Sequence, residues 1–454
     1  MNFPDHIFKA YDIRGLVEGE LSEDLAYKIG RAFVQILRNR GENLQNKKIV
    51  VGHDMRESSP AFQTAVTKGI NDEGLDVVDI GLTSTPLFNF ACAHYPEHIG
   101  GIMITASHNP AEYNGFKMTY ADGLPLGKET GMTELKELAK KNNFKDAGEK
   151  GIVEKKDIYS DYETKVLSLV DINKIKTMKI VVDAGNGMAK VSLPKILENI
   201  SVEVEYLYLE PDGNFPNHES NPLKIETLKD LQKKVVEIGA DLGFALDGDA
   251  DRIGLVDEKG VVVPASFVGG LIGLEVLAKN PASRMLYDLR LSRAVVDLWE
   301  NAGATTAMTK VGHANIKKQM KEECGIFASE LSLHLYYRDM YDVECTDLSL
   351  LYILKILSDK NQPLSEVWQA MNTKFHSGEI NFRVDDIDKI LQSLKEKYID
   401  ADLNELDGLL FTYSDYWFSV RASNTEPVLR LNLEADSEKL MQGKLTEVKN
   451  IIER

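Results

Sequence analysis

Residues 179–187 read KIVVDAGNG, a run of β-branched residues that passes directly into a polar, glycine-rich segment. Such a run predicts a buried strand that ends in a loop. A stretch with helical patterning follows, and the apolar run at 202–209 then predicts a returning strand. The alternation of strand, loop, helix and strand is typical of α/β layers with parallel strands.

The same arrangement occurs twice more. KIVV at 48–51 leads to Asp54, a helical stretch and the apolar run at 77–80, while RMLY at 284–287 leads to Asp288, a helical stretch from about Ser292 and the run at 304–309. Repeats that start at residues 48, 179 and 284 are too widely spaced for a solenoid. They predict three similar α/β domains with mixed, mostly parallel sheets.

The C-terminal part has a different pattern. Strand patterns at 380–384, 409–413, 417–420 and 428–433 accompany helical patterns at 385–397 and 437–452. One strand–helix step followed by a meander predicts a smaller α+β domain.

Charge and composition exclude several classes of protein. The 454 residues carry 53 Lys and Arg against 71 Asp and Glu, a net charge of −18, which has the wrong sign for binding nucleic acid or an anionic membrane. Three widely spaced cysteines form no disulfide framework and no zinc motif. We find no signal-peptide pattern at the start, and the longest uncharged apolar stretch, 261–274, is too short for a membrane span of ~20 residues. The sequence predicts a soluble, cytoplasmic protein.

The first candidate for chemistry is the loop TASHNP at 105–110, which follows the apolar run 101–104. Ser107 at the end of a strand is well placed as an exposed nucleophile, although the loop lacks the GxSxG pattern of hydrolases. A serine needs a base, a metal ion or covalent activation to react. Because neighbouring side chains diverge in extended backbone, we do not expect a direct pair between Ser107 and His108. The alternative is an ordinary turn whose Ser and Asn satisfy backbone groups.

The second candidate is DGDADR at 247–252, which places Asp247, Asp249 and Asp251 within five residues. Two like charges 4 Å apart repel by about 4 kcal/mol at an effective dielectric constant near 20, and a divalent cation offsets this. Glu258 would even fit position 12 of an EF-hand, but Arg252 stands at position 6, where glycine is needed, and both flanks read as strands. We therefore expect Mg²⁺ and not Ca²⁺, with a solvated turn as the alternative.

The third candidate is RASNTEP at 421–427, between two predicted strands. Arg421 offers a bidentate fork for phosphate, Ser423 and Thr425 add hydroxyl groups, and successive N–H groups can bind an anion. Basic residues also stand in the predicted loops and at strand ends, where ligands of α/β sheets bind. These are Arg14, Lys117, Arg252, Lys310 and Lys317.

Together and in this order, the three loops closely resemble the α-D-phosphohexomutase family over essentially the whole chain. The RASNTEP loop is similar to that of the phosphomannomutase/phosphoglucomutase group, and less similar to that of phosphoglucosamine mutases. The resemblance implies four domains around a central cleft, which we place at residues 1–150, 151–256, 257–370 and 371–454.

The resemblance also implies roles for individual residues. Ser107 would be the phosphoserine, Lys117 the general acid/base, and His108, Arg14 and Arg252 its catalytic neighbours. Mg²⁺ would be held by Asp247, Asp249, Asp251 and phosphorylated Ser107. The substrate would be bound by His313, Glu330, Ser332, Arg290, Arg421, Ser423, Asn424 and Thr425.

The implied reaction interconverts hexose 6-phosphates and hexose 1-phosphates, of mannose, glucose or both, through a hexose 1,6-bisphosphate. The partners would be small sugar phosphates, and the protein a monomer or dimer. The sugar loop departs from the family: GEMSGH is usual, but 329–334 read SELSLH, with Ser329 and Leu333 in place of glycines. If either glycine is needed for a positive φ or a close approach, its replacement is costly. Arg290 also stands where many relatives have lysine. Residues 344–347 read ECTD, where relatives often have a pair of acidic residues before a glycine. Alternatives are a weakly catalytic sugar-phosphate-binding protein, a phosphatase or a phosphoglucosamine-type mutase.

Overall fold

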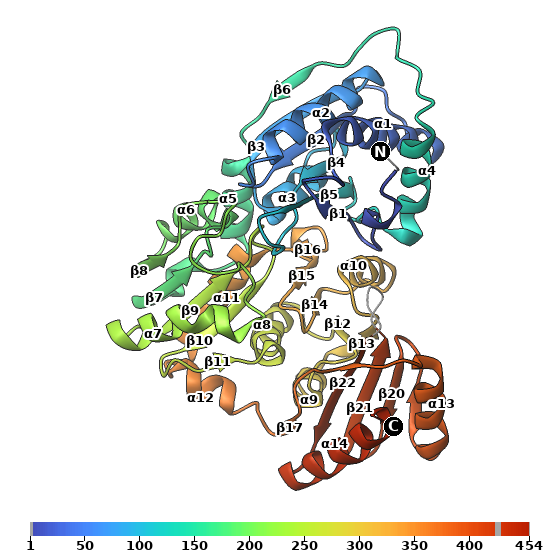
Figure 1. Ribbon diagram of the computed structural model, residues 1–454. Helices are drawn as coiled ribbons and strands as arrows, with labels where there is room; N and C mark the ends of the chain where they lie inside the picture. The colour runs from blue at the N-terminus through green and yellow to red at the C-terminus, as the bar shows by residue number, and fades with distance from the viewer. Residues whose placement is uncertain (1–2, 423–427, 454) are drawn as a thin grey trace.

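The computed structural model describes residues 3–422 and 428–453, which form four domains (Figure 1). The first domain has a six-stranded sheet in the order β1-β5-β4-β2-β3-β6. Its strands are β1 (Ile13–Leu16), β2 (Lys48–His53), β3 (Asp76–Leu82), β4 (His98–Ile104), β5 (Tyr113–Tyr120) and β6 (Val153–Lys155). Its helices are α1 (Glu23–Asn39), α2 (Ser59–Asp72), α3 (Thr85–His94) and α4 (Thr133–Lys141).

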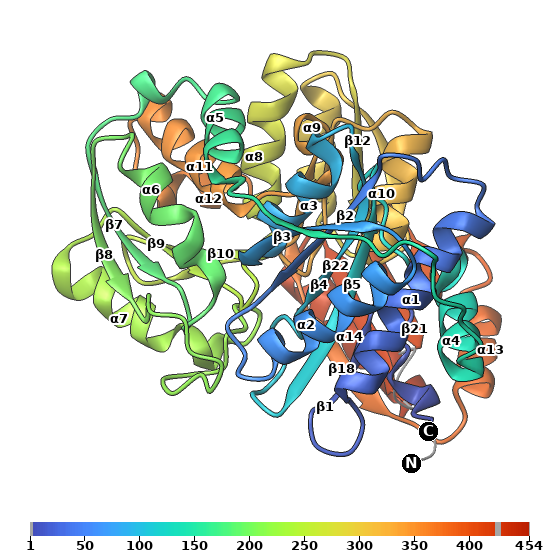
Figure 2. The ribbon, with the colours of Figure 1, turned by 90° about the horizontal axis from the view of Figure 1, so that it is seen from above.

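The second domain has the order β11-β10-β9-β7-β8. Its strands are β7 (Met178–Asp183), β8 (Val202–Leu207), β9 (Leu242–Leu246), β10 (Ile253–Asp257) and β11 (Val262–Val263). Its helices are α5 (Tyr159–Ser168), α6 (Leu193–Leu197) and α7 (Lys229–Ile238). Viewed from above, this domain lies at one side of the molecule (Figure 2).

The third domain repeats the plan in the order β13-β12-β14-β15-β16. Its strands are β12 (Arg284–Asp288), β13 (Thr305–Thr309), β14 (Phe327–Ser329), β15 (Leu335–Tyr337) and β16 (Val343–Glu344). Its helices are α8 (Ala265–Lys279), α9 (Arg293–Asn301), α10 (His313–Glu322), α11 (Thr346–Lys360) and α12 (Leu364–Gln369).

The fourth domain is an antiparallel sheet in the order β17-β22-β21-β20-β19, with β18 also paired to β22. Its strands are β17 (Phe375–His376), β18 (Ile380–Arg383), β19 (Asp402–Asn404), β20 (Leu409–Thr412), β21 (Tyr416–Ala422) and β22 (Val428–Ala435). Helices α13 (Ile387–Lys397) and α14 (Glu438–Ile452) accompany it, and Figure 1 shows the domain set apart from the others.

The predicted architecture of three α/β domains with mixed sheets and a smaller α+β domain is confirmed. In each of the first three sheets, parallel pairs such as β2–β4, β7–β9 and β12–β14 lie inside, and antiparallel pairs complete one side. Two sheets extend past boundaries drawn from the sequence: β6 lies beyond residue 150 and joins the first sheet, and β11 lies beyond residue 256 and joins the second.

Apolar packing separates the core of the fourth domain from the cores of the first three domains. One continuous cluster runs from α3 through the second domain into the third and includes Phe88, Phe244 and Leu351. The other face of the first sheet packs on α1 and α2 around Phe33. The fourth domain has a separate core around Phe418. The first three domains therefore share a core, while the fourth meets them through polar contacts described below.

Local sequence explains how the elements that carry the site begin. The side chain of Ser84 caps α3 by accepting a hydrogen bond from the N–H of Leu87, and Ser22 caps α1 in the same way through Leu25. Strand β4 is buried along its whole length because helices cover both faces of its sheet. Among the described residues, each helix is too short or too polar to cross a lipid bilayer.

Candidate active site

The serine loop joins β4 to β5 and is held by a buried arginine. Arg56 donates hydrogen bonds to the carbonyl oxygens of Ser107 (2.9 Å), Pro110 (2.7 Å) and Tyr113 (2.9 Å). Ser107 is 1% exposed, and its backbone has a φ of +52°, in the left-handed region. The loop is therefore fixed in a shape that an extended chain cannot adopt.

This shape corrects the expectation that Ser107 and His108 do not meet. Ser107 Oγ lies 3.1 Å from His108 Nδ1, because the left-handed residue turns the two side chains to the same side. Ser107 Oγ also donates to Asp247 Oδ2 at 3.1 Å. Burial, with the charges of Arg252 and Arg14, holds the pKa of His108 well below its usual value, so the ring is neutral.

The aspartate loop joins β9 to β10 and meets the serine loop directly. Side-chain oxygens of Asp247, Asp249 and Asp251 lie within 4.8 Å of one another, and all three residues are buried. A Cβ atom on Gly248 would lie 2.5 Å from the carbonyl oxygen of Ser107, so only glycine permits this close contact of the two loops. The sequence motifs of the first and second domains thus form one cluster.

A divalent cation fits this cluster. Burial and the charges of Asp251 and Asp249 raise the pKa of Asp247 well above its usual value. Among the described residues, Asp249 Oδ1 is buried and has no hydrogen-bond partner. Three carboxylates with an unsatisfied oxygen are the hard donor set that Mg²⁺ binds.

Lys117 of β5 reaches into the same cluster. Its Nζ lies 2.5 Å from Asp249 Oδ2 and 2.7 Å from Asp251 Oδ2. Burial opposes the charge of Lys117, but the two carboxylates outweigh it and raise the pKa of the amine above its usual value. The side chain is therefore a buried ammonium group at the edge of the aspartate cluster.

Two arginines flank Ser107. Arg14, on β1, donates to Asp12 Oδ2 (2.7 Å) and to Asn109 Oδ1 (2.6 Å) in the serine loop. Arg252 Nε lies 3.7 Å from Asp247 Oδ2. Both arginines line the cavity at Ser107, so the chain of net charge −18 has basic groups at this point.

The loop at 329–334 brings the third domain to the same cavity. Glu330 is buried and accepts hydrogen bonds from the hydroxyl group of Tyr336 (2.8 Å) and the N–H of Gly312 (3.0 Å). Ser332 Oγ lies 2.8 Å from His334 Nδ1. The oxygens of Glu330 and Ser332 are thus oriented by neighbours.

Both residues that replace the family glycines in this loop are accommodated. Leu333 has a φ of +69°, so this position does require the left-handed region. Its side chain is buried, and a Cβ atom on Gly254 of the second domain would lie 3.7 Å from Leu333 Cδ1. Ser329 packs against α8, where a Cβ atom on Gly269 would lie 2.0 Å from Ser329 Oγ. Gly269 therefore makes room for Ser329, whereas Leu333 packs beside Gly254 at an ordinary van der Waals distance.

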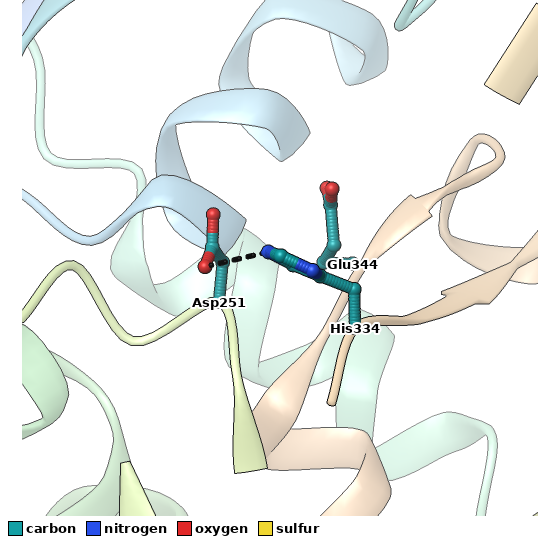
Figure 3. Close-up of side chains that lie close together, drawn as sticks. All are labelled: Asp251, His334 and Glu344. Carbon is teal, nitrogen blue, oxygen red and sulfur yellow. Dashed lines mark ion pairs between the residues drawn. The ribbon is translucent and has the colours of Figure 1, made fainter. Parts of the chain in front are cut away.

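His334 was not among the residues selected from the sequence. Its Nε2 lies 3.2 Å from Asp251 Oδ1, and despite burial this carboxylate raises the pKa of His334 to about 9. Figure 3 shows His334 together with Asp251 and Glu344, a second group whose geometry could hold a metal ion. Lys317 Nζ, however, lies 2.7 Å from Glu344 Oε2. The three aspartates offer three carboxylates to a cation and this group only two, which favours the aspartates for Mg²⁺.

Arg290 follows β12 and lies at the junction with the fourth domain. It donates to Asp288 Oδ2 (2.8 Å) and to Glu379 Oε2 (3.3 Å). The same Asp288 oxygen accepts from the N–H of Leu331 at 2.7 Å. The guanidinium group thus connects the loop at 329–334 to the fourth domain.

His313 begins α10 and also lines the cavity at Ser107. Its ring centroid lies 5.3 Å from that of Tyr11, and burial with the charges of Lys317 and Lys117 keeps the pKa of His313 well below its usual value. Lys317 was predicted as part of a basic loop with Lys310, but it lies on α10 and is buried.

The RASNTEP loop at 421–427, called the phosphate loop below, is only partly described. Arg421, at the end of β21, lines a neighbouring cavity and has Nη1 3.7 Å from Asp407 Oδ2. Ser423, Asn424 and Thr425 lie outside the described residues. Of the other selected residues, most line the cavity at Ser107 or contact a residue that lines it, whereas Arg290 lies farther away, at the junction with the fourth domain.

Sequence reasoning missed Arg56 and Thr85. Arg56 stands in the loop that follows β2, and Thr85 is the first residue of α3, which follows β3. Thr85 Oγ1 donates to Asp249 Oδ2 at 2.6 Å, and its N–H donates to the carbonyl oxygen of Asp249 at 2.9 Å. Position at a strand end was the available signal, but no motif marks these two residues.

Four family models match the chain in order. They are the phosphoglucomutase/phosphomannomutase alpha/beta/alpha domains I, II and III, at residues 5–146, 158–260 and 267–375, and the C-terminal domain, at 379–450.

Full-length relatives carry related names. The chain is 39% identical to a phosphomannomutase of Methanocaldococcus jannaschii, over 98% of this chain and 97% of the relative. It is 37% identical to a phosphomannomutase of Escherichia coli, over 94% of both chains. A solved phosphoglucomutase/phosphomannomutase family protein from Burkholderia thailandensis superposes with a TM-score of 0.90 at 31% identity, over 98% of this chain and 97% of that one.

Proposed function

The chain belongs to the phosphoglucomutase/phosphomannomutase family, and we propose that it interconverts hexose 6-phosphates and hexose 1-phosphates of mannose and glucose through a phosphoserine at Ser107. The activity is that of a phosphohexomutase, an intramolecular phosphotransferase. The observation that carries the proposal is the contact of two loops: Ser107 Oγ lies 3.1 Å from Asp247 Oδ2, next to Lys117 and Arg14. Phosphoryl transfer needs in-line positioning and charge neutralisation, and this cluster supplies the groups for both.

In the forward half-reaction, the bond between Ser107 Oγ and phosphorus breaks while a sugar hydroxyl oxygen forms a new bond to the same phosphorus. Lys117, an ammonium group in the free protein, would give its proton to Ser107 Oγ as this oxygen leaves and take up the proton of the sugar hydroxyl, so that no net proton is gained or lost. In the return half-reaction Ser107 Oγ forms a bond to the opposite phosphorus of the 1,6-bisphosphate while the bond from that phosphorus to the sugar oxygen breaks. Lys117 gives its proton to the sugar oxygen and takes up the proton of Ser107 Oγ. Arg14 and Arg252 balance the charge on the equatorial oxygens.

The metal ligands proposed are Asp247, Asp249, Asp251 and the phosphate on Ser107. When bound there, Mg²⁺ supplies positive charge beside the phosphoryl group. Thr85 supports this site from outside, because its hydroxyl group holds Asp249 Oδ2 at 2.6 Å.

The rest of the substrate would meet the third and fourth domains. Glu330 and Ser332 would offer oxygens to sugar hydroxyl groups beside His334, which lines the cavity at Ser107 together with His313. Arg290 is turned to Asp288 and Glu379, so we assign it to positioning the sugar loop and not to direct sugar contact. Arg421, with Ser423, Asn424 and Thr425, would bind the phosphate that is not reacting.

The test is a coupled assay for conversion of mannose 1-phosphate, glucose 1-phosphate and glucosamine 1-phosphate, with Mg²⁺ and a trace of the 1,6-bisphosphate. Turnover of mannose or glucose phosphate is expected. No turnover on either, with Ser107 verified as phosphorylated, contradicts the proposal and leaves a binding protein. Preference for glucosamine 1-phosphate would identify a phosphoglucosamine-type mutase. Release of free phosphate at the same rate as conversion of the sugar phosphate would identify a phosphatase.

A further inference from the structure

A second cavity adjoins the one at Ser107. It has a volume of about 680 Å³ and shares Tyr11 with the first cavity. Its lining comes from the first, third and fourth domains and is strongly basic. The described titratable groups other than Tyr11 are His6, Lys9, Lys128, Glu129, Lys136, Lys310, Lys318, Asp407 and Arg421. Only two of these are carboxylates, and Asp407 is the one beside the arginine of the phosphate loop.

Asp407 holds two groups that a phosphate would also bind. Its Oδ2 accepts a hydrogen bond from the backbone N–H of Val311 at 3.0 Å and lies 3.7 Å from Arg421 Nη1. Val311 belongs to the third domain and Arg421 to the fourth, so one carboxylate oxygen connects the two domains. Among the described residues, Arg421 Nε is buried and has no hydrogen-bond partner.

The backbone fixes Asp407 in this place. The next residue, Gly408, has a φ of +80°, and a Cβ atom on it would lie 2.6 Å from the carbonyl oxygen of Val420 and 3.0 Å from Arg421 Cα. Only glycine combines this conformation with so close a contact. The turn at 407–408 is therefore packed against the end of β21, with the carboxylate beside the guanidinium group.

We propose that Asp407 is an internal competitor of the substrate for Arg421. In the free protein it occupies the guanidinium group and the N–H of Val311, and the non-reacting phosphate displaces it on binding. This inference rests on the proposed function, because a bisphosphate intermediate must be released from Arg421 before it can turn end for end. Basic walls alone would bind each phosphate tightly, and the nearby carboxylate lowers that affinity by competition and by repulsion.

The test compares Asp407→Asn with the wild type. Asparagine keeps an oxygen that can accept from the N–H of Val311 but removes the negative charge. Titration calorimetry with inorganic phosphate and with mannose 6-phosphate should show binding tighter by up to about 5-fold, the upper end of the range expected for loss of a partly exposed competing ion pair. In the mutase assay KM should fall by a similar factor, and kcat should also fall because release is slower.

Glu405→Gln is the matched control. It removes a carboxylate two residues away that pairs with Lys395 at 2.7 Å, and phosphate affinity should stay within about 2-fold of wild type. Asp407→Ala removes both the negative charge and the acceptor for the N–H of Val311. Its comparison with Asp407→Asn therefore separates the effect of the charge from that of the interdomain hydrogen bond.

Unchanged or weaker phosphate binding by Asp407→Asn, in a protein with wild-type thermal stability, overturns the inference, as does an absence of phosphate binding in both proteins. If both the Asn and the Ala variants bind more weakly, Asp407 is only a tie between domains. Binding is measured without turnover. A wild type that binds phosphate but does not convert sugar phosphates therefore contradicts the proposed function while the comparison still decides the role of Asp407.

Discussion

Lys117 Nζ lies 2.5 Å from Asp249 Oδ2, so a cation of the first domain and a carboxylate of the second form a buried ion pair beside Ser107. Neither partner tolerates burial alone, because an unpaired charge in this environment costs several kcal/mol. The pair therefore holds β5, the strand that follows the serine loop, against the aspartate loop before any ligand binds.

Asp249→Asn should reduce phosphoryl transfer by at least about 100-fold, because the neutral side chain weakens the metal site. The fold should be retained, since an asparagine oxygen can still accept from Thr85 Oγ1 and the N–H of Thr85 bonds to the backbone at 249. The coupled assay and circular dichroism check the two parts. Activity near that of the wild type would overturn the assignment of Asp249 to the metal.

Addition of Mg²⁺ should raise the melting temperature of the wild type and leave that of Asp249→Asn nearly unchanged. A ligand at 100 times its Kd stabilises the native state by about 2.7 kcal/mol, and the variant lacks one of the charges that bind it. Differential scanning fluorimetry with Mg²⁺ and then with a chelator measures the shift. Equal shifts in both proteins would show that the ion binds elsewhere.

Leu333→Gly should lower the free energy of unfolding by about 1 kcal/mol, because the loss of a buried leucine outweighs relief of the strain at a φ of +69°. Leu333→Ala loses the same packing but keeps the strain. Alanine should therefore be less stable than glycine, the reverse of the usual order. Urea unfolding of the two variants checks this, and a more stable alanine variant would contradict the left-handed backbone at this position.

The activity of Leu333→Gly should remain within about 3-fold of wild type. The leucine side chain packs toward Gly254 of the second domain, and so its loss removes no polar group that faces the substrate. A larger change in KM for mannose 1-phosphate relative to glucose 1-phosphate would instead give Leu333 a role in sugar selection.

Asp347 should make the protein less stable as the pH rises from about 4 to about 6. Burial raises the pKa of Asp347 to about 6, although Tyr162 donates a hydrogen bond to it at 2.7 Å. In this window the native state binds a proton that the unfolded state has lost, so unfolding becomes easier as pH increases, by about 3 kcal/mol in total.

Asp347→Asn removes this effect while keeping an acceptor for Tyr162. The variant should gain stability relative to wild type between about pH 4.5 and pH 7.5. Unfolding curves at the two pH values give the difference, and a pH-independent difference would mean that the carboxyl group is not buried as the structure has it.

The repeat of strand, loop and helix was sufficient to predict the four domains, because local apolar patterning determines each element and right-handed parallel units then pack in one way. The domain boundaries were harder to predict from the sequence. Strand β6 joins the first sheet through pairing with β3, and Val153 in it is exposed, so no apolar run marks it.

The candidate site was predicted to the extent that motifs mark it. The contact between Ser107 and His108 was not predicted. It depends on the φ of +52° at Ser107, in a loop held by hydrogen bonds from Arg56, a residue far away in sequence. Contacts such as that of Asp407 with Val311 depend on how whole domains dock, and one sequence carries no signal for them.

The most direct test of the account follows a labelled phosphoryl group. The protein is incubated with ³²P-labelled glucose 1,6-bisphosphate, digested, and mapped by peptide sequencing, and a parallel sample is chased with unlabelled mannose 1-phosphate. We predict label on Ser107, loss of that label in the chase, and its appearance in mannose 1,6-bisphosphate and mannose 6-phosphate. Label on another residue, or label on Ser107 that the sugar phosphate cannot remove, would contradict the central claim that Ser107 carries the phosphoryl group in a hexose-phosphate mutase.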